Sequence, residues 1–258
     1  MNILDKILEK KKIEVELRKK SFPIEKQMLK DAPLRASFKD ALTQKNSKPA
    51  IIAELKKASP SRGVIRENFD PETLAKGLEK SGASALSVLT EKNFFLGSLD
   101  NLKIAVSQVK IPILRKDFIF DPYQLLEAKL FGASAALLIA RMLEKDELKH
   151  LIDFAREIEL DILTETHSAE EIEIAAECGA EIIGVNSRDL ATFKTDLSAV
   201  SDLLNLIPNN CKKVAESGIN THEELEFMFK AKADACLIGG ALMEAENPPE
   251  KLKNLLGL

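Results

Sequence analysis

A short phrase recurs at nearly even intervals along this chain and constrains its fold more than any other feature. Gly-Ala-Ser or a close variant begins at positions 82, 132, 179 and 232, so the intervals are 50, 47 and 53 residues. Each interval contains two short apolar runs, which sets one strand-plus-helix unit at about 25 residues. The phrase precedes each second run, where a glycine in the left-handed conformation closes a helix.

Eight apolar runs follow one another from residue 51 onward, at 51–53, 85–89, 111–114, 135–140, 160–163, 182–185, 214–215 and 236–238. They are continuous rather than alternating, which is typical of strands buried on both faces of a parallel sheet. Helix starts lie between them, as Asp70-Pro71, as Asp121-Pro122, and as the capping-box pairs at 168/171 and 221/224. Eight such units predict an α/β fold, a (β/α)8 TIM barrel. The alternative, an open doubly wound sheet, lacks its glycine-rich nucleotide motifs here.

Residues 1–48 fall outside the repeat and predict an N-terminal helical extension, followed by a barrel catalytic domain over 49–258. Ile3, Leu4, Ile7 and Leu8 form one apolar face of a helix. This helix either covers the mouth of the barrel or plugs its amino-terminal face, and both readings stay open. We interpret the basic residues at 10–12 and 18–20 as a solvated face.

Composition narrows the classes of partner. The formal net charge is −4, which disfavours nucleic acid as a ligand. No apolar stretch is long enough for a membrane span. The three cysteines are scattered and odd in number, and the three histidines are isolated, so we expect a reducing compartment, the cytoplasm, and no metal. We expect a monomer that binds a small molecule, with no nucleic-acid or membrane partner.

Charged and polar side chains interrupt or follow the apolar runs where a barrel places its active site, at the carboxyl ends of the strands. Burial of a charge is costly unless the charge is paired or functional, so Glu54, Lys56, Lys116 and Glu165 are catalytic candidates. Asn186, Arg188, Glu216 and Ser217 also stand at strand ends.

Small residues follow the seventh and eighth runs, as Ser217-Gly218-Ile219 and as Gly239-Gly240-Ala241-Leu242. Their backbone N–H groups can converge on an anion, which is the usual arrangement for phosphate in such barrels. The sequence therefore predicts a phosphorylated substrate held near Gly218, Gly239 and Gly240.

Seven segments at successive strand ends resemble the indole-3-glycerol phosphate synthases of tryptophan biosynthesis, and the resemblance runs almost end to end. They are IIAELKKASPSRG (51–63), LTEKNFFLGS (89–98), PILRKDFI (112–119), LTETH (163–167), GVNSRDLATF (184–193), VAESGI (214–219) and LIGGALM (237–243). Gly240 departs from the family pattern, in which a side chain with a hydroxyl or carboxylate is frequent.

The resemblance implies a lyase that needs neither metal nor organic cofactor. Its reaction closes the ring of 1-(2-carboxyphenylamino)-1-deoxyribulose 5-phosphate, with loss of CO2 and water, to give indole-3-glycerol phosphate. Lys116 then matches the family's general acid, and Glu165 matches its proton-transfer group for dehydration. Further roles are implied for Lys56 and Arg188 as substrate cations, Glu54 as the partner of Lys56, Asn186 and Ser217 as hydrogen-bonding groups, Phe95 and Phe118 as apolar walls, and Ser59 in the loop after the first strand.

Two alternatives remain at this point. A related phosphate-binding barrel isomerase relies on an Asp or Cys acid–base pair at strand ends, which is not evident in this sequence. A non-catalytic scaffold has no need of Lys116 and Glu165, and both are present.

Overall fold

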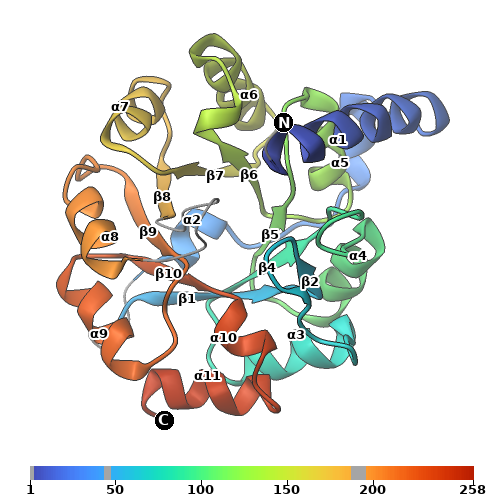
Figure 1. Cartoon of the computed structure of the whole chain (residues 1–258). Helices are drawn as coiled ribbons and strands as arrows, with labels where there is room; N and C mark the ends of the chain where they lie inside the picture. The colour runs from blue at the N-terminus through green and yellow to red at the C-terminus, as the bar shows by residue number, and fades with distance from the viewer. Residues whose placement is uncertain (1–2, 44–47, 187–195) are drawn as a thin grey trace.

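Eight parallel strands close into a barrel in the computed structural model, which describes residues 3–43, 48–186 and 196–258. Each strand pairs with the next along the chain, and the first pairs with the last (Figure 1). The predicted (β/α)8 barrel is therefore confirmed. Its strands are β1 (Ala50–Leu55), β4 (Ala85–Leu89), β5 (Ile113–Lys116), β6 (Ala135–Ile139), β7 (Asp161–Thr166), β8 (Ile182–Asn186), β9 (Lys212–Glu216) and β10 (Ala235–Ile238).

Helices surround the barrel and begin where the sequence marks them. Asp70 and Asp121 each accept a backbone N–H at the start of a helix, and Thr221 with Glu224 forms a complete capping box. The outer helices are α3 (Pro71–Lys80), α4 (Leu99–Gln108), α5 (Pro122–Leu130), α6 (Lys145–Glu157), α7 (Ala169–Glu177), α8 (Leu197–Leu204), α9 (His222–Lys230) and α11 (Pro248–Leu256), with the short η2 (Ala140–Met142) and α10 (Gly240–Met243).

The recurring phrase is the place where each helix ends. Gly82, Gly132 and Gly179 have φ values of 103°, 84° and 83°, in the left-handed region that glycine adopts at low cost. Lys232, which stands where the phrase lacks its glycine, takes the same conformation with a φ of 63°. The left-handed backbone conformation at the helix end is thus retained even where lysine replaces glycine.

Two features depart from the apolar runs. β7 continues through Thr164, Glu165 and Thr166, which are polar but buried: Glu165 lines the cavity, and the Thr166 hydroxyl donates to the carbonyl oxygen of Gly184 on β8. A small antiparallel hairpin, β2 (Ala58–Ser59) with β3 (Gly63–Val64), forms in the loop after β1 and is too short to show as a sequence pattern.

The N-terminal extension divides between the two ends of the barrel. It contains α1 (Ile3–Ser21), η1 (Lys26–Asp31) and α2 (Phe38–Ala41). α1 lies beside α5 at the rim, whereas α2 lies in the middle of the ring of strands (Figure 1). The first turn of α1 lines the cavity at the carboxyl ends of the strands, as Ile3, Leu4 and Ile7. The helix with this apolar face therefore lies at the mouth of the barrel, and a different segment, α2, lies at the other end.

The amino end of the barrel is filled by the second part of the extension. Phe38 and Leu42 are fully buried and pack with inward-facing residues such as Ile52 and Leu114. The interpretation of residues 10–12 as a solvated face is wrong for Lys11, which is only 1% exposed because it pairs with a buried carboxylate. Among the described helices, none is long and apolar enough to cross a membrane.

Candidate active site

The carboxyl ends of the barrel strands surround a cavity of about 250 Å³. Arg188 lies outside the residues that the structure describes. The other predicted site residues all line the cavity: Glu54, Lys56, Ser59, Phe95, Lys116, Phe118, Glu165, Asn186, Ser217, Gly218, Gly239 and Gly240. Residues that are far apart in the sequence thus meet at one place because each lies near the end of a parallel strand or in the loop after it.

Lys116 stands at the centre of the ionisable groups. It is the last residue of β5, and its Nζ lies 2.8 Å from Glu165 Oε2 on β7 and 2.7 Å from Glu216 Oε2 on β9. Burial alone would lower the pKa of Lys116, but the charges of Glu165, Glu216 and Glu54 outweigh it and hold that pKa above its usual value. The side chain is therefore an ammonium at neutral pH.

The two carboxyl groups beside Lys116 differ in their surroundings. Burial opposes ionisation of Glu165, but the charges of Lys116 and His167 outweigh it and hold its pKa below the usual range. Asn186 Nδ2 also donates to Glu165 Oε1 at 3.2 Å. Burial raises the pKa of Glu216, and among the described residues none donates to its Oε1. At neutral pH the arrangement favours an ionised Glu165 and a protonated Glu216.

A second ion pair lies on β1 and the loop that follows it. Glu54 Oε1 accepts a hydrogen bond from Lys56 Nζ at 2.6 Å. Burial would raise the pKa of Glu54, but the charges of Lys56 and Lys116 hold it below its usual value. The Glu54 carboxylate can occupy this position only because residue 239 is a glycine: a Cβ there would overlap Glu54 Oε1. Gly184 gives Glu216 its space in the same way.

His167 connects Glu165 to a neighbouring helix. Its Nε2 lies 3.4 Å from Glu165 Oε1, and its Nδ1 lies 3.4 Å from Oε2 of Glu171 on α7. Glu171 is also paired with Arg141, at 3.3 Å. Oε1 of Glu165 is thus contacted by both His167 and Asn186.

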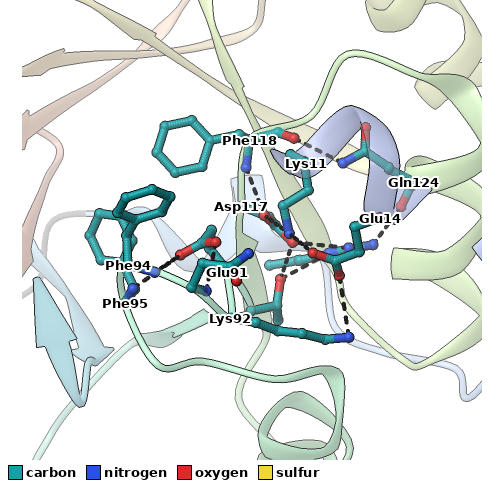
Figure 2. Close-up of polar contacts among 12 residues, drawn as sticks. Lys11, Glu14, Glu91, Lys92, Phe94, Phe95, Asp117, Phe118 and Gln124 are labelled. Carbon is teal, nitrogen blue, oxygen red and sulfur yellow. Dashed lines mark hydrogen bonds and ion pairs between the residues drawn. The ribbon is translucent and has the colours of Figure 1, made fainter. Parts of the chain in front are cut away.

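Two phenylalanines form an apolar wall on the β4–β5 side of the cavity. The ring centroids of Phe95 and Phe118 are 6.0 Å apart, and the ring planes are inclined by 44°. Figure 2 shows how the loop with Phe95 is held: the Glu91 carboxylate accepts the backbone N–H groups of Asn93, Phe94 and Phe95 at 2.8, 2.7 and 3.0 Å. The wall is therefore built from two loops that polar contacts hold in place.

The β9 and β10 ends of the cavity carry the small residues predicted to hold phosphate. Ser217 and Gly218 have positive φ values of 69° and 84°, so the chain turns sharply as it leaves β9. Gly239 follows β10 and Gly240 begins α10. Small residues allow an anion to approach the backbone closely.

Sequence reasoning gave no role to two residues of this site. Glu216 carries the same signal as Glu165, a carboxylate that ends a strand, yet only the structure shows that it contacts Lys116. His167 follows Glu165 by two residues and so lies on the same face of the chain, which is the signal that places it at the mouth. No group of three or more potential metal ligands occurs among the described residues.

The closed barrel, with ionisable side chains buried at its carboxyl end, defines this chain as a TIM-barrel enzyme. Solved structures with the same fold include 3-hexulose-6-phosphate synthase from Salmonella typhimurium, with a TM-score of 0.65 and 11% identity over 80% of this chain and 96% of that one. Thiamine phosphate pyrophosphorylase from Pyrococcus furiosus gives a TM-score of 0.61 and 17% identity over 82% of this chain and 95% of that one.

The chain belongs to the indole-3-glycerol phosphate synthase family, whose model matches residues 4–255. An indole-3-glycerol phosphate synthase of Campylobacter jejuni subsp. doylei is 47% identical over 98% of this chain and 100% of its own length. One from Dehalococcoides mccartyi is 44% identical over the same shares of both chains. The resemblance seen in the sequence is thereby confirmed.

Proposed function

We propose that Lys116, Glu165 and the residues around them carry out the indole-3-glycerol phosphate synthase reaction in this chain. An aryl carbon of the substrate attacks the ketone carbon, CO2 leaves the aromatic ring, and loss of water then completes the indole. The observation that carries the proposal is the placement of Lys116 Nζ between two carboxyl groups, 2.8 and 2.7 Å away, inside the cavity.

Lys116 acts as the general acid in the first step. The ketone oxygen gains negative charge as the new carbon–carbon bond forms, and an alkoxide is basic enough to take a proton from an ammonium. Because the ionised carboxylates of Glu165 and Glu54 keep Lys116 charged, the proton is in place before the substrate reacts. The same charge stabilises the developing oxyanion.

Glu165 acts as the proton acceptor in dehydration. Loss of water from the new ring requires removal of a proton next to the departing hydroxyl, so Glu165 needs to be ionised beforehand. The lowered pKa of Glu165 meets this requirement. Asn186 and His167 contact its Oε1, whereas its Oε2 faces Lys116. The departing hydroxyl needs a proton in turn, which the Lys116 ammonium supplies once it has been reprotonated.

The remaining predicted residues bind the two ends of the substrate. Phe95 and Phe118 hold the aromatic ring, and the backbone near Ser217, Gly218, Gly239 and Gly240 holds the phosphate, with Ser59 beside it. Lys56, fixed by Glu54, and Arg188 supply positive charge for the anionic groups. An ion pair at about 4 Å is worth roughly 4 kcal/mol at an effective dielectric constant of 20, before desolvation, which is enough to orient a substrate.

We also propose that the chain is a cytoplasmic monomer. Residues 49–258 form its catalytic domain, and the reaction uses neither a metal nor an organic cofactor. In support, the three cysteines are free and buried, and each proton transfer of the reaction has a candidate side chain. The net charge of −4 supports the absence of a nucleic-acid partner.

The test is turnover of 1-(2-carboxyphenylamino)-1-deoxyribulose 5-phosphate by the purified chain, followed by the absorbance of the indole product. We expect formation of indole-3-glycerol phosphate and CO2 in equal amounts in the presence of a chelator. A folded chain that binds the substrate without converting it would contradict the proposal.

A further inference from the structure

The barrel buries a lysine that belongs to the N-terminal helix. Lys11 lies in the middle of α1, and its Nζ is 3.0 Å from Asp117 Oδ1 and 3.0 Å from Glu14 Oε2. Burial would lower the pKa of Lys11, but Asp117 and Glu14 hold it above its usual value. Since a buried charge is costly without its partner, α1 has one favoured position on the barrel.

Alternating charges connect α1 to the barrel at two points. Asp117 Oδ2 is 3.1 Å from Arg115 Nη2, and Arg115 Nη1 is 2.9 Å from Glu127 Oε2 on α5. Glu127 Oε1 in turn lies 2.5 Å from Nε of Arg18, two turns after Lys11 on α1. The series begins and ends on the same helix, so rotating or sliding α1 would break both ends together.

Asp117 stands between the proposed general acid and the aromatic wall. Its Oδ1 accepts the backbone N–H of Phe118 at 2.9 Å, and its Oδ2 accepts the hydroxyl of Thr90 at 2.6 Å. Gln124 Nε2 donates to the carbonyl oxygen of Phe118 at 2.8 Å. Figure 2 shows Lys11 reaching this carboxylate from α1. The carboxylate that receives Lys11 therefore also fixes the backbone directly after Lys116.

Glu14 makes a second connection, to the other half of the wall. Its Oε1 lies 3.6 Å from Nζ of Lys92, in the loop after β4 (Figure 2). Lys92 follows Glu91, whose carboxylate holds the backbone N–H of Phe95. Both loops that carry the wall thus contact the same turn of α1.

We propose that Lys11 and Glu14 are positioning residues, through which α1 fixes Phe118 and Phe95 for the aromatic end of the substrate. The inference rests on the proposed function for the identity of that end. The phosphate end is formed by the loops after β9 and β10, and neither Lys11 nor Glu14 is paired with a residue of these loops. Loss of the contacts should therefore weaken one end of the site and spare the other.

The experiment compares Lys11→Met with Lys12→Met in the full chain, since Lys12 is the next residue on α1 and is exposed. Calorimetry measures the binding of two probes, 2-aminobenzoate for the aromatic end and inorganic phosphate for the other. In Lys11→Met the dissociation constant for 2-aminobenzoate should rise about tenfold or more, because misplaced contact groups lose much of their effect. The constant for phosphate should not change, and Lys12→Met should match the unaltered chain.

Substrate kinetics give a second readout. Lys11→Met should raise KM more than it lowers kcat, and Glu14→Gln should show the same selective pattern with a smaller change. If Lys11→Met does not fold, Glu14→Gln decides the matter through the same two probes. Equal weakening of both probes, or no change in either, would overturn the positioning role. Absence of turnover in the unaltered chain would count against the proposed function alone, because probe binding is measured without catalysis.

Discussion

Lys116 is the residue on which two carboxyl groups converge, and its removal gives the first prediction. Lys116→Met should reduce kcat about 10²–10⁴-fold, the usual contribution of a general acid. The fold should persist because methionine fills similar space, although it should be less stable, since buried Glu165 loses its partner. Steady-state kinetics with circular dichroism as the folding control make the measurement. A variant that kept more than about half of the original turnover would remove Lys116 from this role.

Glu165 gives a prediction that separates its proton-transfer role from its shape. Glu165→Gln keeps the size and hydrogen-bonding capacity of the side chain but has no proton to exchange at neutral pH. Turnover should fall while KM stays nearly the same. Because the pKa of Glu165 is held low, the unaltered enzyme should lose activity only on marked acidification, and the variant should lack that acidic limb. Identical pH profiles for the two proteins would place the base elsewhere.

Gly239 and Gly240 form a matched pair of neighbouring glycines. A Cβ at position 239 would overlap Glu54 Oε1, whereas one at position 240 would find its nearest neighbour, Glu244 Oε1, at 3.5 Å. Gly239→Ala should displace Glu54 from Lys56 and lower kcat/KM about tenfold or more. Gly240→Ala should cost less, and equal losses in both variants would show that backbone space for the phosphate, rather than the Glu54 pair, decides the outcome.

At the scale of elements, α2 gives a prediction about stability. Phe38 is fully buried at the amino end of the barrel, and the cavity lies at the other end. Phe38→Ala should destabilise the fold by about 3–5 kcal/mol, as for other buried aromatic residues, and leave KM unchanged. Phe227→Ala, at a position 40% exposed, is the control. Thermal unfolding and KM measured together test this, and a raised KM without loss of stability would contradict it.

The elements themselves were readable from the sequence because each leaves a local signal. Apolar runs marked all eight barrel strands, and the recurring phrase marked helix ends that the structure shows with positive φ. Polar residues hid the end of β7, since Thr164, Glu165 and Thr166 follow the apolar run and are nevertheless buried.

The sequence predicted which residues form the site better than it predicted which of them contact one another. Strand-end position sufficed to gather Lys116, Glu165 and Glu54 at one mouth. It gave no means of knowing that Lys116 contacts Glu216 as well as Glu165, or that Lys11 pairs with Asp117 from more than a hundred residues away. Such pairs depend on how elements that are far apart in the sequence pack against each other, and no local sequence pattern indicates this.

At the scale of the whole molecule, buried acids make stability depend on pH in opposite directions. Glu54, Asp117 and Glu165 have lowered pKa values, so they add stability above their ordinary pKa, and this is lost as the pH falls through their lowered values. Glu216 has a raised pKa. Above its ordinary value of 4.5 the unfolded chain releases this proton while the folded chain retains it, so Glu216 reduces stability as the pH rises.

Glu216→Gln should therefore remove a loss of stability on the alkaline side. Urea unfolding from about pH 5 to pH 8 should show the free energy of unfolding of the unaltered chain falling relative to that of the variant as the pH rises. Because glutamine resembles the protonated carboxyl group in size, the substitution removes the titration of Glu216 without changing the packing around it. Parallel curves for the two proteins would mean that Glu216 is already ionised in the folded state.

The series of charges that starts and ends on α1 also has a consequence for the order of events during synthesis. Lys11 leaves the ribosome long before Asp117, and Arg18 long before Glu127, yet each needs its partner before it is buried. Stable docking of α1 thus awaits β5 and α5, although α1 precedes both in the sequence. A nascent chain therefore acquires its aromatic subsite only after the third of the eight barrel strands and the helix that follows it have been made.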